Sequence, residues 1–561
     1  MQDCIYGIDL GTTFTKCAVI DPGTSFVRPI EVDHGSLSIQ SIVGLGVEGQ
    51  GTVAYVGSSC AGRMEFPDRS LDQFRVVEEA KRWMGVLEAD VVGAPPWPFN
   101  EWQYIPQDIA ALVLRRVKMA VDERMPGYPL RRAVITHPQK FTQNERLATR
   151  QAGEIAGIQV VTSIAEPDAA ALCYGADNEP GLYMIFDCGG GTLDITIAKI
   201  AGRDSPIDVV TSEGLYKAGR DIDRRILDMM CEQYQASFPD FERTAHLDRT
   251  TEAVWLDRAR TMKEKLGSRS RDGIEIKEQA AEICVRNDAY EGGPCRVRIA
   301  SMEVEHRVKD IIDDFRDCAY KALDYAHISP AGLKAVLLVG GTSRMAAVRR
   351  MIETEPPSGL GARVNAQLDS TTAIASGAAK LAARWKAEAG PAKADDGREA
   401  ESSREPASRA PQLVLDTIRS ALAYGIGIPI LKNDNPCLHV MIPKDTPLPC
   451  VKEQVFRTAN AGDTSIRVDM YFDMFEKDLD EMPEKALLGH CVLAGIPPGQ
   501  PAGRPVEVRI NVAHNEEMRL EVTDCRTGLR TESAVHHNEK AVVRPDDIAA
   551  RRAHISSIRI M

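Results

Sequence analysis

Two segments of this chain share one pattern: an apolar strand that ends in an aspartate, a glycine- and threonine-containing turn, and a second alternating strand. The first is IYGIDLGTTFTKCAVID (5–21) and the second is YMIFDCGGGTLDITIAKI (183–200). Glycine lacks Cβ and tolerates φ > 0, so such turns let amide N–H groups approach an anion. One such turn is equally compatible with a plain hairpin. The repeat predicts two duplicated α/β lobes that face one phosphate-bearing ligand.

A third glycine segment, AVLLVGGTSRMAAVRRMI (335–352), follows the same logic. A buried strand meets Gly340 and Gly341, and a helix is expected to begin at Thr342 or Ser343, where its N-terminus favours anionic groups. Three glycine segments in this order predict a two-lobed phosphate clamp. The G-x-x-x-x-G-K-[ST] phosphate loop and the G-x-G-x-x-G dinucleotide fingerprint are both absent.

Length and composition limit the remaining possibilities. The chain has 561 residues, which predicts two or three domains, and its net charge of −13 argues against a general nucleic-acid or membrane-surface binder. The 13 cysteines show no zinc-type spacing, which favours free thiols in a reducing cytoplasm. No apolar stretch approaches the ~18 residues of a membrane span. Asp3 and Asp9 near the start argue against a secretory signal.

The pattern along the chain predicts an α/β architecture followed by an all-β sandwich. Strands and helices alternate over 1–385, with helices expected at about 106–123, from 143, and at about 302–325. Residues 386–416 combine a polar, apolar-poor insert (386–411) with the short apolar stretch LVLD, and are expected to form a flexible linker. Period-two alternation over 417–547 predicts the sandwich. The only late helical signal is RPDDIAARRAH (544–554), and residues 548–561 are expected to be a short stub without a helical lid.

These motifs resemble those of the heat-shock-70 chaperones, within the actin-like ATPase superfamily. GIDLGTT and IFDCGGGTLDITI are similar to its two phosphate hairpins, LLVGGTSRM to its adenosine stretch, and EEAKRWMG (78–85) to the segment with its catalytic lysine. Residues 133–175 resemble its connecting segment, and LVLD its interdomain linker. TPLPCVKEQVFRTA and LAGIPPGQPAGRPVEVRINV resemble its peptide-binding sandwich. The resemblance therefore implies an actin-like two-lobed ATPase domain before the sandwich.

The resemblance assigns catalytic roles to a small set of residues. Lys81 would position the attacking water, and Asp194 would orient that water or accept its proton. Thr192 would contact the γ-phosphate. Asp9, Glu166 and Asp187 would hold a magnesium ion through waters. This set suits phosphoryl transfer to water, in which positioning and electrostatics supply most of the acceleration.

Further residues carry binding and signalling roles by the same resemblance. The implied nucleotide contacts are Asp9, Gly11, Thr12, Thr13, Gly189, Gly190, Gly191, Thr192, Lys263, Gly340, Gly341, Ser343 and Arg344. The implied interdomain signalling residues are Pro138, Arg146, Leu413, Leu415 and Asp416. The implied peptide-binding residues are Ile426, Phe456, Ala459 and Ile466.

Plain structural roles compete with some of these assignments. Lys81 could be a solvated helix lysine, Glu166 a helix-start carboxylate before Pro167, and Phe456 a core residue. The chain also departs from the family pattern at two positions. Arg220 in KAGRDID and Arg260 in RARTMKEKLG replace glutamates, which bears on nucleotide affinity and base preference.

The resemblance implies an ATP-driven chaperone in which ATP hydrolysis switches the peptide affinity of the sandwich. ATP or ADP and magnesium are the expected cofactors, with potassium as an additional ion. Expected partners are unfolded polypeptides, a J-domain co-chaperone and a nucleotide exchange factor, with no nucleic acid and no membrane. Without a lid, weak peptide binding with fast release is expected. The alternative is a nucleotide-dependent adaptor or exchange factor for one partner; the sandwich and the connecting segment disfavour a small-molecule kinase or a filament-forming protein.

Overall fold

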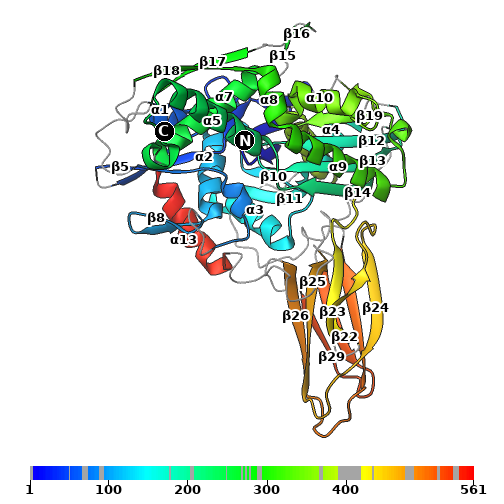
Figure 1. Cartoon of the computed structure of the whole chain (residues 1–561). Coiled ribbons are helices and arrows are strands. Elements are labelled where there is room, and N and C mark those ends of the chain that lie inside the picture. Colours follow the sequence, from blue (N-terminus) through cyan, green and yellow to red (C-terminus); the bar gives the residue numbers. More distant parts are fainter. Residues whose placement is uncertain are drawn as a thin grey trace.

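The computed structural model describes residues 4–49, 51–65, 74–87, 94–175, 179–202, 207–247, 249–266, 269–271, 274–276, 280–286, 293–365, 371–389, 418–432, 435–473, 486–513, 518–534 and 543–561. An α/β part extends to residue 389, and a β-sandwich formed by strands within 425–534 projects away from it (Figure 1). The last described segment, 543–561, returns to the α/β part. Within the described residues, no helix is both long enough and apolar enough to cross a membrane.

The first lobe is built on a sheet with the strand order β11-β10-β1-β2-β3, to which β4 adds through β2. Strand β1 is antiparallel to β2 and parallel to β10. The strands are β1 (Ile5–Leu10), β2 (Phe14–Ile20), β3 (Val27–Ile30), β4 (Ser38–Gln40), β10 (Arg132–His137) and β11 (Gln159–Ala165). Every residue of β1 is buried, as its continuous apolar run predicts.

The second lobe repeats this arrangement in a sheet with the order β20-β19-β12-β13-β14-β21. Strand β12 is antiparallel to β13 and parallel to β19. The strands are β12 (Gly181–Cys188), β13 (Leu193–Ile200), β14 (Ile207–Leu215), β19 (Ala335–Val339), β20 (Val364–Asn365) and β21 (Ile418–Arg419). The two glycine-bearing hairpins therefore hold the same place in the two sheets, as the repeated sequence pattern predicts.

A smaller sheet in the first lobe has the order β30-β6-β5-β7. Its strands are β5 (Val43–Glu48), β6 (Gly51–Val56), β7 (Phe74–Val77) and β30 (Arg559–Ile560). Short hairpins are formed by β8 (Trp97–Phe99) with β9 (Trp102–Tyr104), β15 (Arg269–Arg271) with β16 (Ile274–Ile276), and β17 (Ala280–Val285) with β18 (Cys295–Ala300).

Two expected helices form where the apolar spacing places them, α2 (Pro106–Arg124) and α3 (Gln143–Ile155). The third is divided into α8 (Ser301–Arg307) and α9 (Lys309–Tyr325), because Val308 between them lies outside the helical region at φ −108° and ψ 12°. After Gly341 the chain forms a 3₁₀ turn, η3 (Thr342–Arg344), and α10 begins only at Ala346 (Ala346–Glu353). Further helical elements before residue 365 are α1 (Ser58–Glu65), η1 (Ala80–Trp83), α4 (Glu166–Gly175), α5 (Gly219–Ser237), α6 (Arg243–His246), α7 (Arg249–Leu266) and η2 (Pro330–Gly332).

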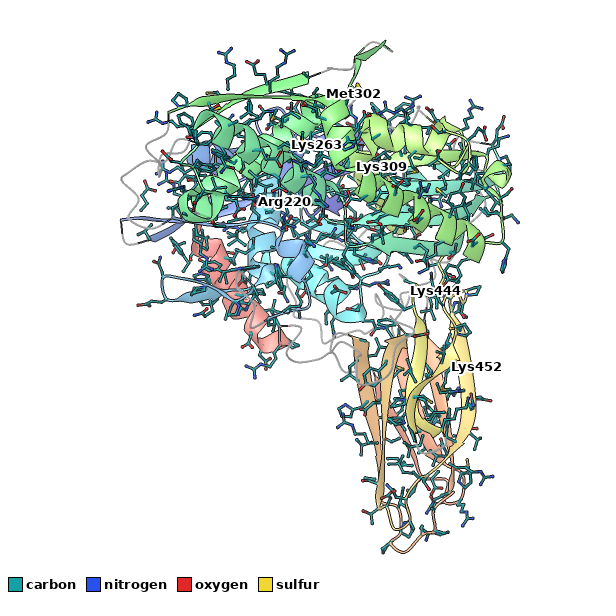
Figure 2. All side chains as sticks on the ribbon, in the orientation of Figure 1. Arg220, Lys263, Met302, Lys309, Lys444 and Lys452 are labelled. Carbon is teal, nitrogen blue, oxygen red and sulfur yellow. The ribbon has the colours of Figure 1, made fainter. Side chains whose placement is uncertain are left out.

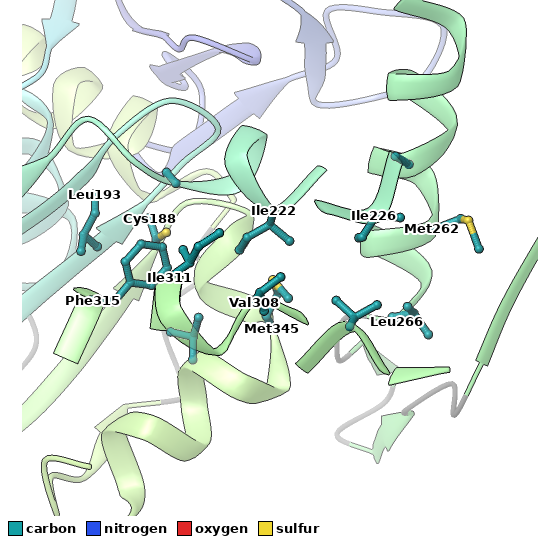
Figure 3. Packing of buried hydrophobic residues seen from close by; sticks show 14 of the residues in the cluster. Cys188, Leu193, Ile222, Ile226, Met262, Leu266, Val308, Ile311, Phe315 and Met345 are labelled. Carbon is teal, nitrogen blue, oxygen red and sulfur yellow. The ribbon is translucent and has the colours of Figure 1, made fainter. Parts of the chain in front are cut away.

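The core of the second lobe anchors its glycine turn. Cys188 and Leu193, which flank the turn, pack in one apolar cluster with Ile222 of α5 and Phe315 of α9 (Figure 3). All four side chains are fully buried. The turn between them is thus held at both ends by a packed core.

Helix α11 (Ala373–Ala389) packs on the first-lobe sheet and shares an apolar cluster with strands of the second-lobe sheet, and it requires close backbone contact. A Cβ atom on Gly7 of β1 would collide with the backbone of α11, and one on Gly377 of α11 would collide with the carbonyl of Ala169 in α4. The helix runs four residues past the expected boundary at 385. The rest of the polar insert, together with Leu413, Leu415 and Asp416, lies outside the described residues.

The sandwich consists of two four-stranded sheets, with the orders β23-β22-β25-β26 and β24-β27-β28-β29. Their inner faces share one apolar core, to which the alternating Val506, Val508, Ile510 and Val512 contribute. The strands are β22 (Gly425–Lys432), β23 (Asn435–Ile442), β24 (Cys450–Arg457), β25 (Ser465–Asp473), β26 (Leu487–Ala494), β27 (Pro505–Val512), β28 (Met518–Asp524) and β29 (Arg530–Ala534).

The C-terminal segment differs from the expected stub. Helix α13 (Pro545–Ser557) begins within the range expected for the sandwich, yet it packs on α2 and α3 (Figure 1). Strand β30 pairs in parallel with β6. Ile555 and Ile558 are buried in the first-lobe core. His554 stacks on Trp102, with ring centroids 3.8 Å apart. Local sequence predicts the helix but not its distant partner.

Candidate functional site

The two glycine turns meet between the lobes. A Cβ atom on Gly190 would collide with the Thr13 hydroxyl, and one on Gly191 would lie tightly against the Thr12 side chain. Glycine is thus required for the close approach of the second-lobe turn to the first. A Cβ on Gly189 would meet no protein atom within 4 Å, so this glycine faces open space. A Cβ atom on Gly11 would collide with the carbonyl oxygen of Phe14, so the first turn also requires glycine at this position.

The third glycine segment joins the same place. Gly340 has φ 78°, and a Cβ there would collide with the carbonyl of Cys188. The Thr342 hydroxyl donates to the Gly189 carbonyl at 2.8 Å, and the Ser343 hydroxyl donates to the Gly340 carbonyl at 2.7 Å. Gly341 and Arg344 are exposed beside this turn. The three glycine segments predicted to act together are therefore in direct contact.

Four carboxylates lie buried around these turns: Asp9, Glu166, Asp187 and Asp194. Asp187 and Asp194 are directly opposite each other across the β12–β13 ladder. Burial raises the pKa of Asp187 well above its usual value, and the charges of Glu166, Asp194 and Asp9 raise it further. Burial also raises the pKa of Glu166 to about 7, against the opposing charge of Lys81. This concentration of negative charge is a feature of functional sites.

Opposing effects act on the pKa of Asp194. Burial raises its pKa, but the charge of Lys140 and a hydrogen bond from Thr192 act in the opposite direction. Thr192, the last residue of the glycine turn, thus contacts the carboxylate that follows it.

Lys81 and Lys16 supply the positive charge. Lys81 lies on η1, is 6% exposed, and forms a buried ion pair with Glu166. It is therefore not a solvated helix lysine. Lys16 Nζ lies 2.8 Å from Asp9 Oδ2. Sequence reasoning missed Lys16, although the hairpin register places it directly opposite Asp9.

The site has features that fit a magnesium ion. Asp187 Oδ2 is buried without a hydrogen-bond partner, and mutual repulsion among the carboxylates raises its pKa. A dication would relieve both conditions. The described residues contain no group of three or more His, Cys, Asp or Glu side chains placed to ligate a metal directly. An ion here would contact Asp9, Glu166 and Asp187 through water, as the resemblance implies.

Lys263 of α7 lies beside the second-lobe turn (Figure 2). Its Nζ is 2.7 Å from Asp223 Oδ1 and donates to the Gly219 carbonyl at 2.9 Å. Gly219 in turn donates its amide to the Gly189 carbonyl at 3.1 Å. Lys263 is thus placed close to the predicted nucleotide contacts.

The segment with Pro138 and Arg146 forms a fixed loop after β10. Pro138 is buried, and Arg146 donates to the carbonyls of Phe141 and Gln139 at 2.8 and 3.0 Å. Burial lowers the pKa of the adjacent His137 well below its usual value, so this histidine is neutral. Between Pro138 and Arg146, Lys140 extends toward the second lobe and lies 3.4 Å from Glu213 Oε2.

Glu213 of β14 joins three parts of the molecule. Besides Lys140 from the first lobe, it contacts Lys321 of α9 at 3.4 Å and forms an ion pair with Lys444. Lys444 lies at the end of the sandwich that is next to the α/β part (Figure 2). Next to it, Asp445 Oδ2 accepts from the Thr211 hydroxyl at 3.0 Å. Sequence reasoning missed this junction, because Glu213 sits in an ordinary alternating strand and its partners are distant in sequence.

The predicted peptide-binding residues do not share one surface. Ile426 is 0% exposed in the sandwich core, which differs from the expectation, because β22 lies between β23 and β25. Phe456 is half-buried and packs edge-on against His439, while Ala459 is exposed. Ile466 lines a small pocket at the loop end of the sandwich with Thr458, Asn460, Asp463, Ile496, Gln500, Pro501 and Arg504.

Comparison with known proteins agrees with this geometry. Residues 5–554 match a family model described as Hsp70 protein. The chaperone protein DnaK of Thermosipho melanesiensis is 28% identical, with 96% of this chain and 81% of the relative covered. DnaK of Thermotoga neapolitana gives the same identity and coverage. The chaperone protein dnaK1 of Synechocystis sp. is 29% identical, with 95% of this chain and 72% of the relative covered.

Proposed function

The chain belongs to the Hsp70 protein family, and from this we propose that it is an ATP-dependent chaperone with an actin-like ATPase domain before a peptide-binding sandwich. ATP would bind between the two lobes, and its hydrolysis would change the affinity of the sandwich for unfolded polypeptide. The relatives are themselves named chaperones. The observation that carries the proposal is the contact of the two glycine turns, Gly190 against Thr13, amid four buried carboxylates.

Each residue of the site has a chemical task in this proposal. A bound magnesium ion would neutralise phosphate charge. Lys81, held by Glu166, would hold the attacking water and stabilise developing charge. Asp194 would orient the same water and accept its proton, since burial already raises its pKa. Gly189 faces open space, which leaves its side of the turn free for phosphate oxygens.

Communication between the domains would run through the junction at Glu213. Lys140 connects this carboxylate to the loop with Pro138 and Arg146, and Lys444 connects it to the sandwich. A shift of the Lys140 loop on hydrolysis would therefore alter the sandwich contact. Leu413 and Leu415 are proposed as a second route: if the Leu413→Asp, Leu415→Asp variant keeps full peptide-dependent turnover, that route is wrong.

The cellular setting is part of the proposal. Thirteen free cysteines fit a reducing cytoplasm. A J-domain co-chaperone and a nucleotide exchange factor are the proposed partners, and potassium is a proposed additional ion.

The test is steady-state ATP hydrolysis with and without a panel of extended hydrophobic peptides. A chaperone should hydrolyse ATP faster when peptide binds. If no peptide changes the rate of ATP hydrolysis, the result would indicate the adaptor function instead. Absence of ATP hydrolysis would contradict the enzymatic assignment.

A further inference from the structure

Arg220 is fixed to the glycine turn of the second lobe. It is the second residue of α5, and its backbone amide donates to the Gly190 carbonyl at 2.7 Å. Its neighbour Gly219 donates to the Gly189 carbonyl at 3.1 Å. Any movement of this turn therefore moves the backbone of Arg220.

The Arg220 side chain leaves its own lobe and reaches the first. It forms an ion pair with Glu78, and its Nε lies 3.1 Å from Glu79 Oε1. Both acids belong to the first lobe, between β7 and η1, and they directly precede the element that carries Lys81. Arg220 is only 8% exposed, so solvent screens these pairs weakly.

The Lys81 element is thereby held at two points. Glu79 adopts φ 56°, a strained backbone for a non-glycine residue, directly before η1. On one side Arg220 binds Glu78 and Glu79; on the other, Lys81 binds Glu166. Burial lowers the pKa of Arg220, but the charges of Glu78, Glu79 and Asp223 raise it above its ordinary value.

A second arginine, Arg260, also contacts the first lobe, in this case at an aromatic ring. Arg260 of α7 is paired with Asp257 on its own helix, and its guanidinium carbon lies 5.6 Å from the ring centroid of Phe14 in the first lobe. Phe14 directly follows Thr13 of the first glycine turn. Both positions at which the sequence replaces an expected glutamate by arginine therefore contact the opposite lobe.

We propose that Arg220 is a positioning residue that latches the lobes together through Glu78 and Glu79, fixing the Lys81 element and slowing nucleotide release. The inference rests on the proposed placement of the nucleotide between the lobes. Moving the lobes apart would separate a guanidinium from two carboxylates, which opposes the movement. Arg220 thus restrains release and keeps Lys81 in place for hydrolysis.

The test compares four forms of the full chain: wild type, Arg220→Glu, the charge swap Arg220→Glu with Glu78→Arg and Glu79→Arg, and Arg225→Glu. Arg225 is a matched control, since it lies on the same helix and forms an exposed pair with Asp310 within the second lobe. One measurement is the dissociation rate of a fluorescent ADP. The other is amide hydrogen exchange over residues 78–84 without nucleotide.

Arg220→Glu is expected to release ADP at least tenfold faster and to exchange faster over 78–84, while the charge swap recovers most of both effects and Arg225→Glu changes neither. Unchanged release and exchange in Arg220→Glu, or a swap that recovers nothing, would overturn the latch. If wild type binds no ADP, the proposed function fails, and the exchange measurement still decides whether the latch exists.

Discussion

Arg551, near the C-terminal end of the sequence, forms an ion pair with Asp108, whose carboxylate is fully buried at the start of α2. The same carboxylate oxygen accepts from the amide of Ile105 at 3.2 Å and from the Trp102 indole at 3.4 Å. Residues 543–561 are therefore part of the first lobe rather than an appendage of the sandwich. The α/β part therefore contains segments that precede the sandwich in sequence and a segment that follows it.

Replacing Arg551 should destabilise the first lobe in a pH-dependent way. Burial raises the pKa of Asp108 to about 6, against the charge of Arg551. The folded-state pKa exceeds the unfolded value of about 3.9, so this group favours folding at low pH, and that contribution is lost as pH rises through 6. Arg551→Ala removes the compensating charge and should raise the pKa of Asp108 further. The free energy of unfolding should therefore fall most above pH 6, by about 3 kcal/mol, and less at pH 5.

Denaturant unfolding of Arg551→Ala and wild type between pH 5 and 8 checks this expectation. The neighbouring exposed Arg552 supplies the control, and Arg552→Ala should remain close to wild type at every pH. A loss in Arg551→Ala that does not depend on pH would show that packing, not the ion pair, provides the stability.

Lys81→Ala should separate ATP binding from hydrolysis. The lysine is buried against Glu166, so its removal takes away the charge proposed to stabilise the reaction while leaving the glycine turns in contact. Single-turnover hydrolysis should fall by at least about 100-fold, equivalent to about 2.7 kcal/mol, with ATP affinity changed only a few-fold. Lys309→Ala, on an exposed helical pair, is the control. Hydrolysis at the wild-type rate in Lys81→Ala would remove Lys81 from the mechanism.

The features that the sequence predicts depend on local patterns, and the features that it does not predict depend on contacts between residues far apart in the chain. The hairpins with Asp9 and Asp187 were evident because turn chemistry and strand periodicity are local. Helix α13 was also predicted, but its docking was not, since Arg551 and Asp108 interact across almost the whole chain. Glu213 was missed for the same reason. Ile426, an implied peptide-binding residue, is buried in the sandwich core because β22 lies between β23 and β25, and strand order cannot be read from one strand.

Two neighbouring glycines should respond differently to alanine. Gly190→Ala would push a methyl group into the Thr13 hydroxyl, so it should lower stability without nucleotide by about 1–3 kcal/mol. Gly189→Ala meets no protein atom within 4 Å and should leave that stability unchanged. Because its methyl would occupy the proposed phosphate side, ATP affinity should nevertheless fall. Thermal melts with and without ATP distinguish the two; equal melting temperatures for both nucleotide-free variants would contradict the observed contact between the turns.

Glu213→Gln should loosen the sandwich. The buried carboxylate contacts Lys140, Lys321 and Lys444 together, and an amide cannot compensate their charges. Lys321 is largely exposed, so its pair with Glu213 contributes little stability. The loss of the pairs with Lys140 and Lys444 should lower the free energy of unfolding by about 2 kcal/mol. Hydrogen exchange should rise at least tenfold at residues 138–142 and 443–448, and peptide should stimulate ATP hydrolysis less. Glu232→Gln, which breaks an exposed pair with Arg307, should change neither. If exchange rises only around Lys321 and not around Lys140 and Lys444, Glu213 does not join the sandwich to the first lobe.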